Sequence, residues 1–231
     1  STAGSITPSA QWVNATAGFS ISKYTGTGSA TTVGTGLSAA ADLYIVKRTN
    51  DTGHWNVAST AVGIGYDGVI LNLTSDKGNN SSSTSYWNNT APTSTVVSIG
   101  TADNVNKSGD TYMMYCWTSI PGFSHFGTYE GNGDANGSFI YLGFRPKWFL
   151  IKEHDGTTDW YILDSARSPN NEVVKSLKSN SNAAEVTDNN FVDFLSNGVK
   201  FRTDGGAVNG NGDGYIFAAF AEHPFKTSRA R

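Results

Sequence analysis

The chain has 231 residues, of which 38% are hydrophobic and 12% aromatic, enough to bury the core of one large domain or of two domains of about a hundred residues each. Its 26 glycines and its low share of charged residues, 15%, favour strands and turns over long surface helices. The net charge of −3, without a basic stripe, argues against nucleic acid as a partner. No stretch reaches the roughly 18 apolar residues that insertion of a helix into a membrane requires.

The first half of the chain reads as strands. Residues 43–47 form a short apolar run of β-forming residues, followed by a turn cluster at 49–53 and by Trp55, which predicts a β-hairpin. Residues 111–118 are apolar on both faces and predict a strand at the centre of a packed sheet. The lone cysteine, Cys116, lies in this run. It excludes an internal disulfide, and we expect it to be a buried thiol rather than a reactive one.

Tyr86 and Trp87 stand out because residues 81–85 before them and 88–90 after them are polar. A pair of large aromatic side chains in a polar loop can stack on a sugar ring or on a neighbouring subunit. Tyr86 and Trp87 are therefore the candidate ligand-binding residues. The alternative is that they close the edge of the first core.

The second half of the chain repeats the same order of elements. Residues 148–152 form an apolar run, and a turn cluster at 154–158 and Trp160 follow, which predicts a second hairpin. Residues 215–221 predict a second central strand. One short helix is expected around residues 171–179, where Val173, Val174 and Leu177 have i, i+1, i+4 spacing.

Five sequence matches in the same order, each shifted by 103 to 105 residues, indicate a tandem duplication. The matching pairs are Gly18-Phe19-Ser20 with Gly122-Phe123-Ser124, residues 24–28 with 129–133, 43–47 with 148–152, Trp55 with Trp160, and 109–112 with 212–215. The sequence thus predicts a leader at 1–17, a first unit at 18–121, a second unit at 122–225 and a tail at 226–231.

Units of this size with many short strands predict an all-β fold of two tandem β-sandwiches of jelly-roll type. One larger sandwich, in which the two units exchange strands, is the alternative. The repeated Trp, Gly and Tyr positions are expected to serve packing and turns, so a function is better sought where the two units differ.

Two loops rich in Asn, Asp and Gly resemble the start of a calcium-binding loop. Residues 209–214 alternate oxygen-bearing side chains with glycine, but the position that should hold the closing acidic residue is Phe220. Residues 130–134 are incomplete in the same way. Because tight β-turns also need Asn and Gly, we expect turns at both places, with a calcium site as the alternative. No metal site is assigned.

The remaining polar residues do not form a recognisable catalytic motif. His54 and His154 fall in the predicted hairpin turns and are expected at the surface, whereas His223 follows Glu222, and adjacent residues on extended backbone point to opposite faces. A polysaccharide depolymerase would need two carboxylates about 5–10 Å apart. The candidates Glu130, Asp134, Asp155 and Glu222 are not near-neighbours by any rule of sequence spacing, and their separation depends on the three-dimensional fold. The sequence predicts no catalytic residues, no cofactor and no enzymatic activity.

Long stretches of the chain resemble a repeat domain of unknown function that is found in tail-fibre-like and other virion-associated proteins of marine and aquatic bacteriophages. The residues that carry the resemblance are GFSHFGTYEGNGDANGSFIYLGFRPKWFLIK at 122–152, WYILDSAR at 160–167, DFLSNG at 193–198 and AAFAEHPFK at 218–226, with Tyr24-Thr25-Gly26 and residues 86–90 in the first unit.

The resemblance implies a location rather than a chemistry. It implies a virion structural or adhesion protein, as a tail fibre, a tail tip or a capsid-decorating module, with other virion proteins as partners. A homo-oligomer and contact with a host surface glycan are also expected. An extracellular lectin-like module is the alternative, and a polysaccharide depolymerase is a less favoured one. The family has no catalytic motif that can be carried over to residues of this chain.

Overall fold

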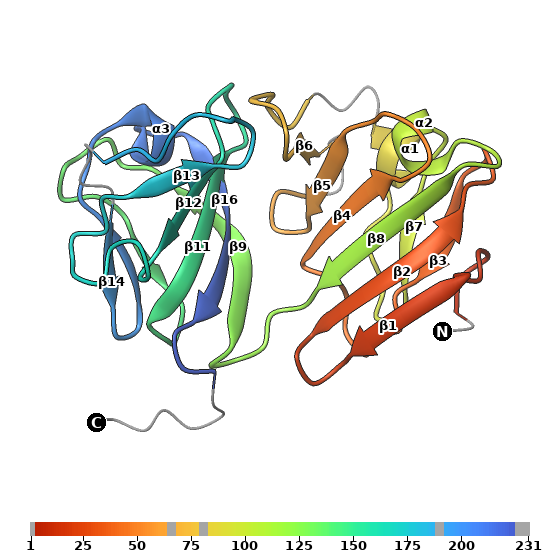
Figure 1. Ribbon diagram of the computed structural model, residues 1–231, viewed down its shortest axis with the longest axis horizontal. Helices are drawn as coiled ribbons and strands as arrows, with labels where there is room; N and C mark the ends of the chain where they lie inside the picture. The colour runs from red at the N-terminus through yellow and green to blue at the C-terminus, as the bar shows by residue number, and fades with distance from the viewer. Residues whose placement is uncertain (1–2, 64–67, 79–82, 188–191, 225–231) are drawn as a thin grey trace. The chain divides into compact units, whose positions relative to one another are not determined.

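The computed structural model describes residues 3–63, 68–78, 83–187 and 192–224, and it is all-β, as predicted (Figure 1). The chain divides into two compact units. The first contains residues 1–71 and 77–118, and the second contains residues 72–76 and 119–231. The predicted tail at 226–231 lies outside the described residues.

The first unit contains two antiparallel sheets. Its strands are β1 (Ala10–Asn14), β2 (Phe19–Thr25), β3 (Thr31–Gly34), β4 (Leu43–Arg48), β5 (Trp55–Ser59), β6 (Val69–Ile70), β7 (Val96–Ile99) and β8 (Thr111–Trp117), and its helices are α1 (Ser83–Trp87) and α2 (Asp103–Asn106). The large sheet has the order β1-β2-β8-β4-β5-β6, and β3 pairs with β7. The predicted hairpin is confirmed as β4–β5, and the predicted central strand as β8.

Part of the predicted leader belongs to the first sheet, because β1 pairs with β2 over its whole length. The core of this unit lies between the two sheets. It joins Tyr112, Met114 and Cys116 of β8 to Val97 and Ile99 of β7. Cys116 is buried, as predicted, and burial raises the pKa of its thiol to about 12. A thiol with so high a pKa forms almost no reactive thiolate at neutral pH.

The second unit also contains two antiparallel sheets. Its elements are β9 (Ser124–Glu130), β10 (Phe139–Tyr141), β11 (Pro146–Glu153), β12 (Tyr161–Asp164), β13 (Ser176–Lys178), β14 (Val192–Leu195), β15 (Gly198–Phe201), α3 (Gly206–Asn209) and β16 (Gly214–Ala221). The sheets have the orders β13-β12-β11-β16-β9 and β10-β15-β14. The second predicted hairpin is confirmed as β11–β12. Phe149 and Phe217 of the large sheet pack with Phe194 and Phe201 of the small one to form the core.

The two large sheets share one strand order. In the first unit β2, β8, β4, β5 and β6 follow one another across the sheet, and in the second β9, β16, β11, β12 and β13 do the same. Each sheet in the described part of the chain takes its strands from one unit only. The structure therefore has a pair of sheets with its own core in each unit, and the alternative of one strand-exchanged sandwich is not what it shows.

A pair of stacked tyrosines positions one short helix in each unit, α2 in the first and α3 in the second. Tyr24 and Tyr112 stack with their ring centroids 5.2 Å apart, and the Tyr24 hydroxyl donates to the Val105 carbonyl of α2 at 2.6 Å. Tyr129 and Tyr215 stack at 4.8 Å, and the Tyr129 hydroxyl donates to the Val208 carbonyl of α3 at 2.7 Å. In both units the second tyrosine also bonds a carbonyl and an amide at the ends of the same helix. The paired rings thus position a single helical turn that is too short to form alone.

The helix predicted at residues 171–179 is absent, and this prediction was wrong. Val173 is buried and bridges to Val192 of β14, while β13 (Ser176–Lys178) pairs with β12. Val173 bonds to one sheet and residues 176–178 to the other, so the apolar residues of this segment are extended and do not form one helical face. Backbone pairing with two sheets outweighed a weak helical pattern.

Candidate functional site

Trp87 does not form the exposed platform that the sequence suggested. Its side chain is only 3% exposed and packs edge-to-face on Tyr44 with the ring centroids 4.9 Å apart. The prediction for Trp87 is therefore corrected: the residue closes the first core, which was the alternative reading. Its polar neighbours concealed this, because the short helix α1 turns one face inward. Tyr86 is half-buried against the same core, and ligand binding at Tyr86 stays a prediction.

The two tryptophans that follow the hairpin turns are packing residues. Trp160 is 2% exposed, and its backbone amide donates to the Asn180 side chain at 2.8 Å. Trp55 is half-buried and stacks on Tyr115 of the central strand with the ring centroids 6.1 Å apart. Both therefore serve the scaffold, as their equivalent places in the two units predicted.

The histidines differ in their environments. His154 was expected at the surface, and this was wrong: the residue is 9% exposed, with its Nδ1 3.2 Å from an oxygen of Asp155. The turn after β11 folds back on the start of β16, where the His154 amide donates to the Gly214 carbonyl at 2.9 Å. His54 is half-buried and His223 is exposed.

The two loops that resemble calcium-binding sequences are joined by one buried side chain, Asn209, which is 0% exposed. Its amide nitrogen donates to the carbonyl oxygens of Asp134 at 3.0 Å and Thr203 at 2.7 Å and to the Asn132 side chain at 2.9 Å. Its side-chain oxygen accepts the Asn132 amide at 3.2 Å. The loops approach so closely that a Cβ on Gly131 would lie 2.1 Å from the Gly210 carbonyl oxygen. The Asn and Gly residues thus build turns, as expected.

Asn106 occupies the matching place in the first unit and is also 0% exposed. Its amide nitrogen donates to the carbonyl oxygens of Ser29 at 2.7 Å and Gly100 at 2.6 Å, and its oxygen accepts the Thr27 amide at 2.8 Å. Sequence reasoning did not single out Asn106, and it considered Asn209 only as part of a calcium-like loop. The signal was available, because each stands three residues before the glycine of the repeated Gly-Asp-x-Tyr motif.

The carboxylates that a depolymerase would use are held in separate local contacts. Glu222 pairs with Arg145 at 3.0 Å, Asp134 accepts the Asn136 amide at 2.7 Å, and Asp155 accepts the Gly214 amide at 3.1 Å. Glu130, at the end of β9, is exposed. Within residues 3–63, 68–78, 83–187 and 192–224, no three His, Cys, Asp or Glu side chains come together as a metal site.

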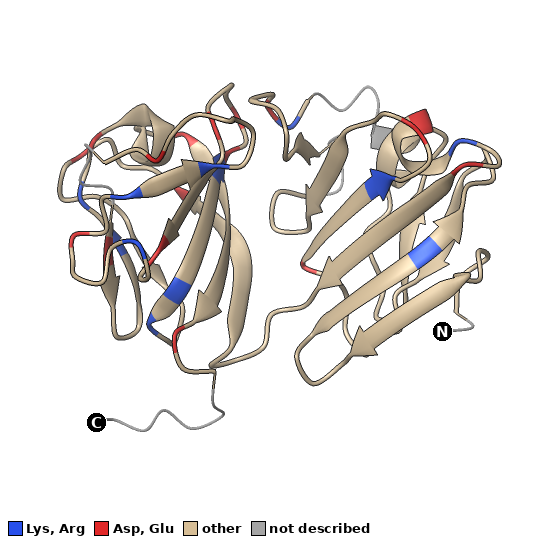
Figure 2. Ribbon diagram, in the orientation of Figure 1, with Lys and Arg blue, Asp and Glu red and all other residues tan. Residues whose placement is uncertain are grey.

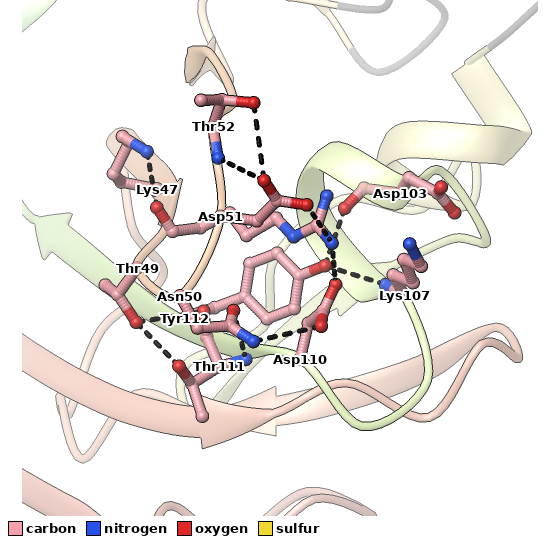
Figure 3. A network of polar contacts seen from close by, with 11 residues as sticks. Lys47, Thr49, Asn50, Asp51, Thr52, Asp103, Lys107, Asp110, Thr111 and Tyr112 are labelled. Carbon is pink, nitrogen blue, oxygen red and sulfur yellow. Dashed lines mark hydrogen bonds and ion pairs between the residues drawn. The ribbon is translucent and has the colours of Figure 1, made fainter.

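A polar network at one end of the large sheet of the first unit is structural (Figure 3). Arg48 is 7% exposed and pairs with both Asp51, at 3.0 Å, and Asp110. Asn50 donates to Asp110 at 3.0 Å and accepts the Thr111 amide at 3.0 Å. The network ties the turn after β4 to the start of β8, and it satisfies a nearly buried charge.

The outward face of the small sheet of the second unit carries large aromatic side chains that are exposed to solvent. Phe139 and Tyr141 of β10 are 46% and 66% exposed, whereas Ile140 between them is buried in the core. They therefore project from the same, outward face of the sheet. The Phe139 ring lies over Gly198 of β15, since a Cβ there would be 3.0 Å from the ring. The two rings thus form an exposed aromatic surface on β10.

Charged side chains stand beside these rings on the same face. Lys200 lies directly opposite Phe139, and Asp193 lies opposite Lys200. Arg202 donates from Nε to Asp193 at 2.7 Å and from Nη2 at 2.6 Å, so two nitrogens of one guanidinium hold one carboxylate oxygen. Elsewhere Lys, Arg, Asp and Glu are scattered over loops and strands (Figure 2). We name Phe139, Tyr141, Asp193, Lys200 and Arg202 the β10 face.

The fold and the site define an all-β protein of two units with two sheets each, and the second unit carries a sheet face with exposed aromatic and charged side chains. The chain belongs to the family of the domain of unknown function DUF7483, whose model matches residues 1–224. No curated protein and no solved structure matches the chain. A search of the described residues finds no helix of the length and apolarity that would cross a membrane.

Proposed function

We propose that this protein is an adhesion protein of a bacteriophage virion and that its β10 face contacts a glycan of the host surface. The observation that carries the proposal is the exposure of Phe139 and Tyr141, 46% and 66%, two residues apart on one strand. Large rings that remain open to solvent on a rigid strand are suited to a partner that supplies the missing contact.

The chemistry of the β10 face suits a sugar. The apolar sides of the Phe139 and Tyr141 rings can stack on the C–H face of a pyranose, as rings do in other recognition sites. Arg202, whose side chain is 38% exposed, pairs with the largely buried Asp193 and keeps further donor positions that can bond sugar hydroxyl groups. A lectin-like mode of binding is therefore part of the same proposal, and the proposal assigns no catalytic step.

The location in a virion rests on the resemblance of the sequence to phage virion proteins. Homo-oligomerisation and contact with other virion proteins are part of the proposal. The outermost strand β1 favours them: Trp12 and Val13 are 55% and 36% exposed, on a strand with one unpaired edge in the described part of the chain. Exposed apolar edge strands are natural places for another chain to pair.

We further propose that the two units are copies of one ancestral unit. The common order of five strands supports this, as do the matching bonds from Tyr24 and Tyr129 to the short helices. The β10 face then belongs to the part in which the copies differ, since β3 and β7 form only a two-stranded sheet in the first unit.

Particle labelling and host adsorption test the location. An antibody to the protein should label purified virions, and the purified protein should compete with virions for adsorption to host cells. Absence of the protein from virions would contradict the location.

Replacing Tyr141 with alanine is expected to weaken binding of the purified protein to host cells about tenfold, because loss of one stacking ring costs about 1.4 kcal/mol. The measurement is a binding isotherm on whole cells. Leu73→Ala is the control, since Leu73 is also an exposed apolar side chain, at 38%, and lies outside the β10 face and outside β1. Equal weakening by both substitutions, or by neither, would remove the β10 face from the proposal.

A further inference from the structure

Lys152 is a fully buried lysine on β11 in the second unit, with 0% of its surface exposed. Its ammonium group donates to three backbone carbonyl oxygens, those of Glu153 at 2.6 Å, Gly156 at 3.0 Å and Thr74 at 3.2 Å. An ammonium group has three N–H donors, so each of them has a carbonyl partner. Such a set compensates for the loss of hydration that burial imposes.

The charge balance around Lys152 explains why a buried ammonium is tolerated. Burial lowers the pKa of Lys152 to about 8, and the carboxylates of Glu153, Asp76 and Asp159 oppose this shift. Asp159 is itself paired with Lys178 at 2.6 Å. At neutral pH the amine therefore keeps its proton and all three donors.

Lys47 occupies the position in the first unit that corresponds to Lys152, and it provides a comparison. It stands 105 residues earlier, on β4, and its ammonium donates to the carbonyl of the next residue, Arg48 (Figure 3). Lys152 makes the same bond to Glu153. Lys47 is only half-buried. The contacts of Lys152 with Gly156 and Thr74 are thus additional to a bond that both lysines make.

The contact of Lys152 with Thr74 is unusual because Thr74 comes from a segment that is flanked on both sides by residues of the first unit. Residues 72–76 belong to the second unit, although residues 71 and 77 on either side belong to the first. Thr74 itself is exposed and lies in the connection between β6 and α1, with no strand of its own. Its bond to Lys152 is a specific polar contact that holds this segment on the second unit.

We propose that Lys152 is a latch that fastens residues 72–76 onto the second unit, so that this unit is completed by a segment from the first half of the chain. The proposal is independent of glycan binding. It predicts that the segment loses protection when the ammonium group is removed, while the sheet beneath it remains formed.

Hydrogen exchange of the full-length chain tests the latch. In Lys152→Met, peptides that cover residues 72–76 should exchange at least tenfold faster than in the wild type, and peptides of β11 and β16 should change much less. Lys47→Met is the matched control and should leave residues 72–76 unchanged. Unchanged exchange of the segment in Lys152→Met, or an equal acceleration over the whole second unit, would overturn the proposal.

Chemical labelling of the wild type gives a result that does not depend on a variant's folding. An amine-specific acylating reagent should modify Lys152 at least tenfold more slowly than Lys47, because reaction at Lys152 requires the latch to open. Equal rates would overturn the proposal. Lys152→Gln adds a graded test: its amide keeps two N–H donors, so residues 72–76 should exchange at a rate between those of the wild type and Lys152→Met.

Discussion

Replacing Asn209 with alanine is expected to lower the free energy of unfolding of the second unit by about 2–4 kcal/mol, because the change leaves buried backbone groups without partners. The Asn209 side chain bonds the Thr203 and Asp134 carbonyl oxygens and the Asn132 amide, and it is 0% exposed. Denaturant unfolding followed by circular dichroism measures the loss. Asn106→Ala should have a similar effect on the first unit, since Asn106 holds the matching loops.

Two further substitutions separate hydrogen bonding from a general effect of mutation. Asn209→Asp keeps the shape of the side chain but replaces its donor group with an acceptor that faces carbonyl oxygens, so it should destabilise at least as much as alanine. Asn197→Ala is the control at an exposed asparagine and should change the free energy by no more than about 0.5 kcal/mol. A loss of less than about 0.5 kcal/mol in Asn209→Ala would contradict the role given to Asn209.

The protein is expected to unfold steeply between about pH 10 and pH 12. Burial raises the pKa of Cys116 above its ordinary 9.0, and it raises the pKa of six described tyrosines above 10.0, most strongly for Tyr24, Tyr44, Tyr129 and Tyr215. In this range the unfolded chain releases protons that the folded chain keeps, so the free energy of unfolding falls as pH rises. Each group lowers the free energy of unfolding by about 1.4 kcal/mol for every pH unit above its ordinary pKa. By about pH 11 the loss in the first unit, which holds Tyr24, Tyr44 and Cys116, therefore approaches the whole stability of a domain, about 5–15 kcal/mol.

Deprotonation of Lys152 changes the stability in the opposite direction as pH rises, but it does not outweigh the effect of the tyrosines and Cys116. Its folded pKa of about 8 is below its ordinary 10.5, so it adds stability as pH rises between these values. The measurement is the denaturant midpoint at each pH together with tyrosinate absorbance. Tyrosinate should form together with unfolding, and Tyr44→Phe should make the decline shallower. Titration of all the tyrosines near pH 10 in a chain that stays folded would contradict the account.

The strands were predictable where hydrophobicity alone decides the structure. Residues 43–47 and 148–152 became β4 and β11, and residues 111–118 and 215–221 became the central strands, because buried strands need continuous apolar runs. Trp87 and His154 were misjudged for the opposite reason. Their neighbours in the sequence are polar, and only the packing of distant elements buries them.

The candidate site was less predictable than the fold. Phe139 and Tyr141 alternate with Ile140, a pattern that any half-buried strand shows, and only the structure reveals that the outward rings remain exposed. The contact between Lys152 and Thr74 joins residues 78 positions apart through a backbone carbonyl. No side-chain pattern marks such an acceptor. Local sequence patterns therefore predict strands and turns, but they do not predict which strand face stays exposed or which distant backbone group a side chain contacts.

Titration of isotope-labelled protein with oligosaccharides released from the host surface tests the proposed β10 face most directly. The chemical shifts should change for residues 137–143 and 193–202, and the change should be lost in Tyr141→Ala. Changes centred on Tyr86, or no changes at any oligosaccharide concentration, would contradict glycan binding at the β10 face.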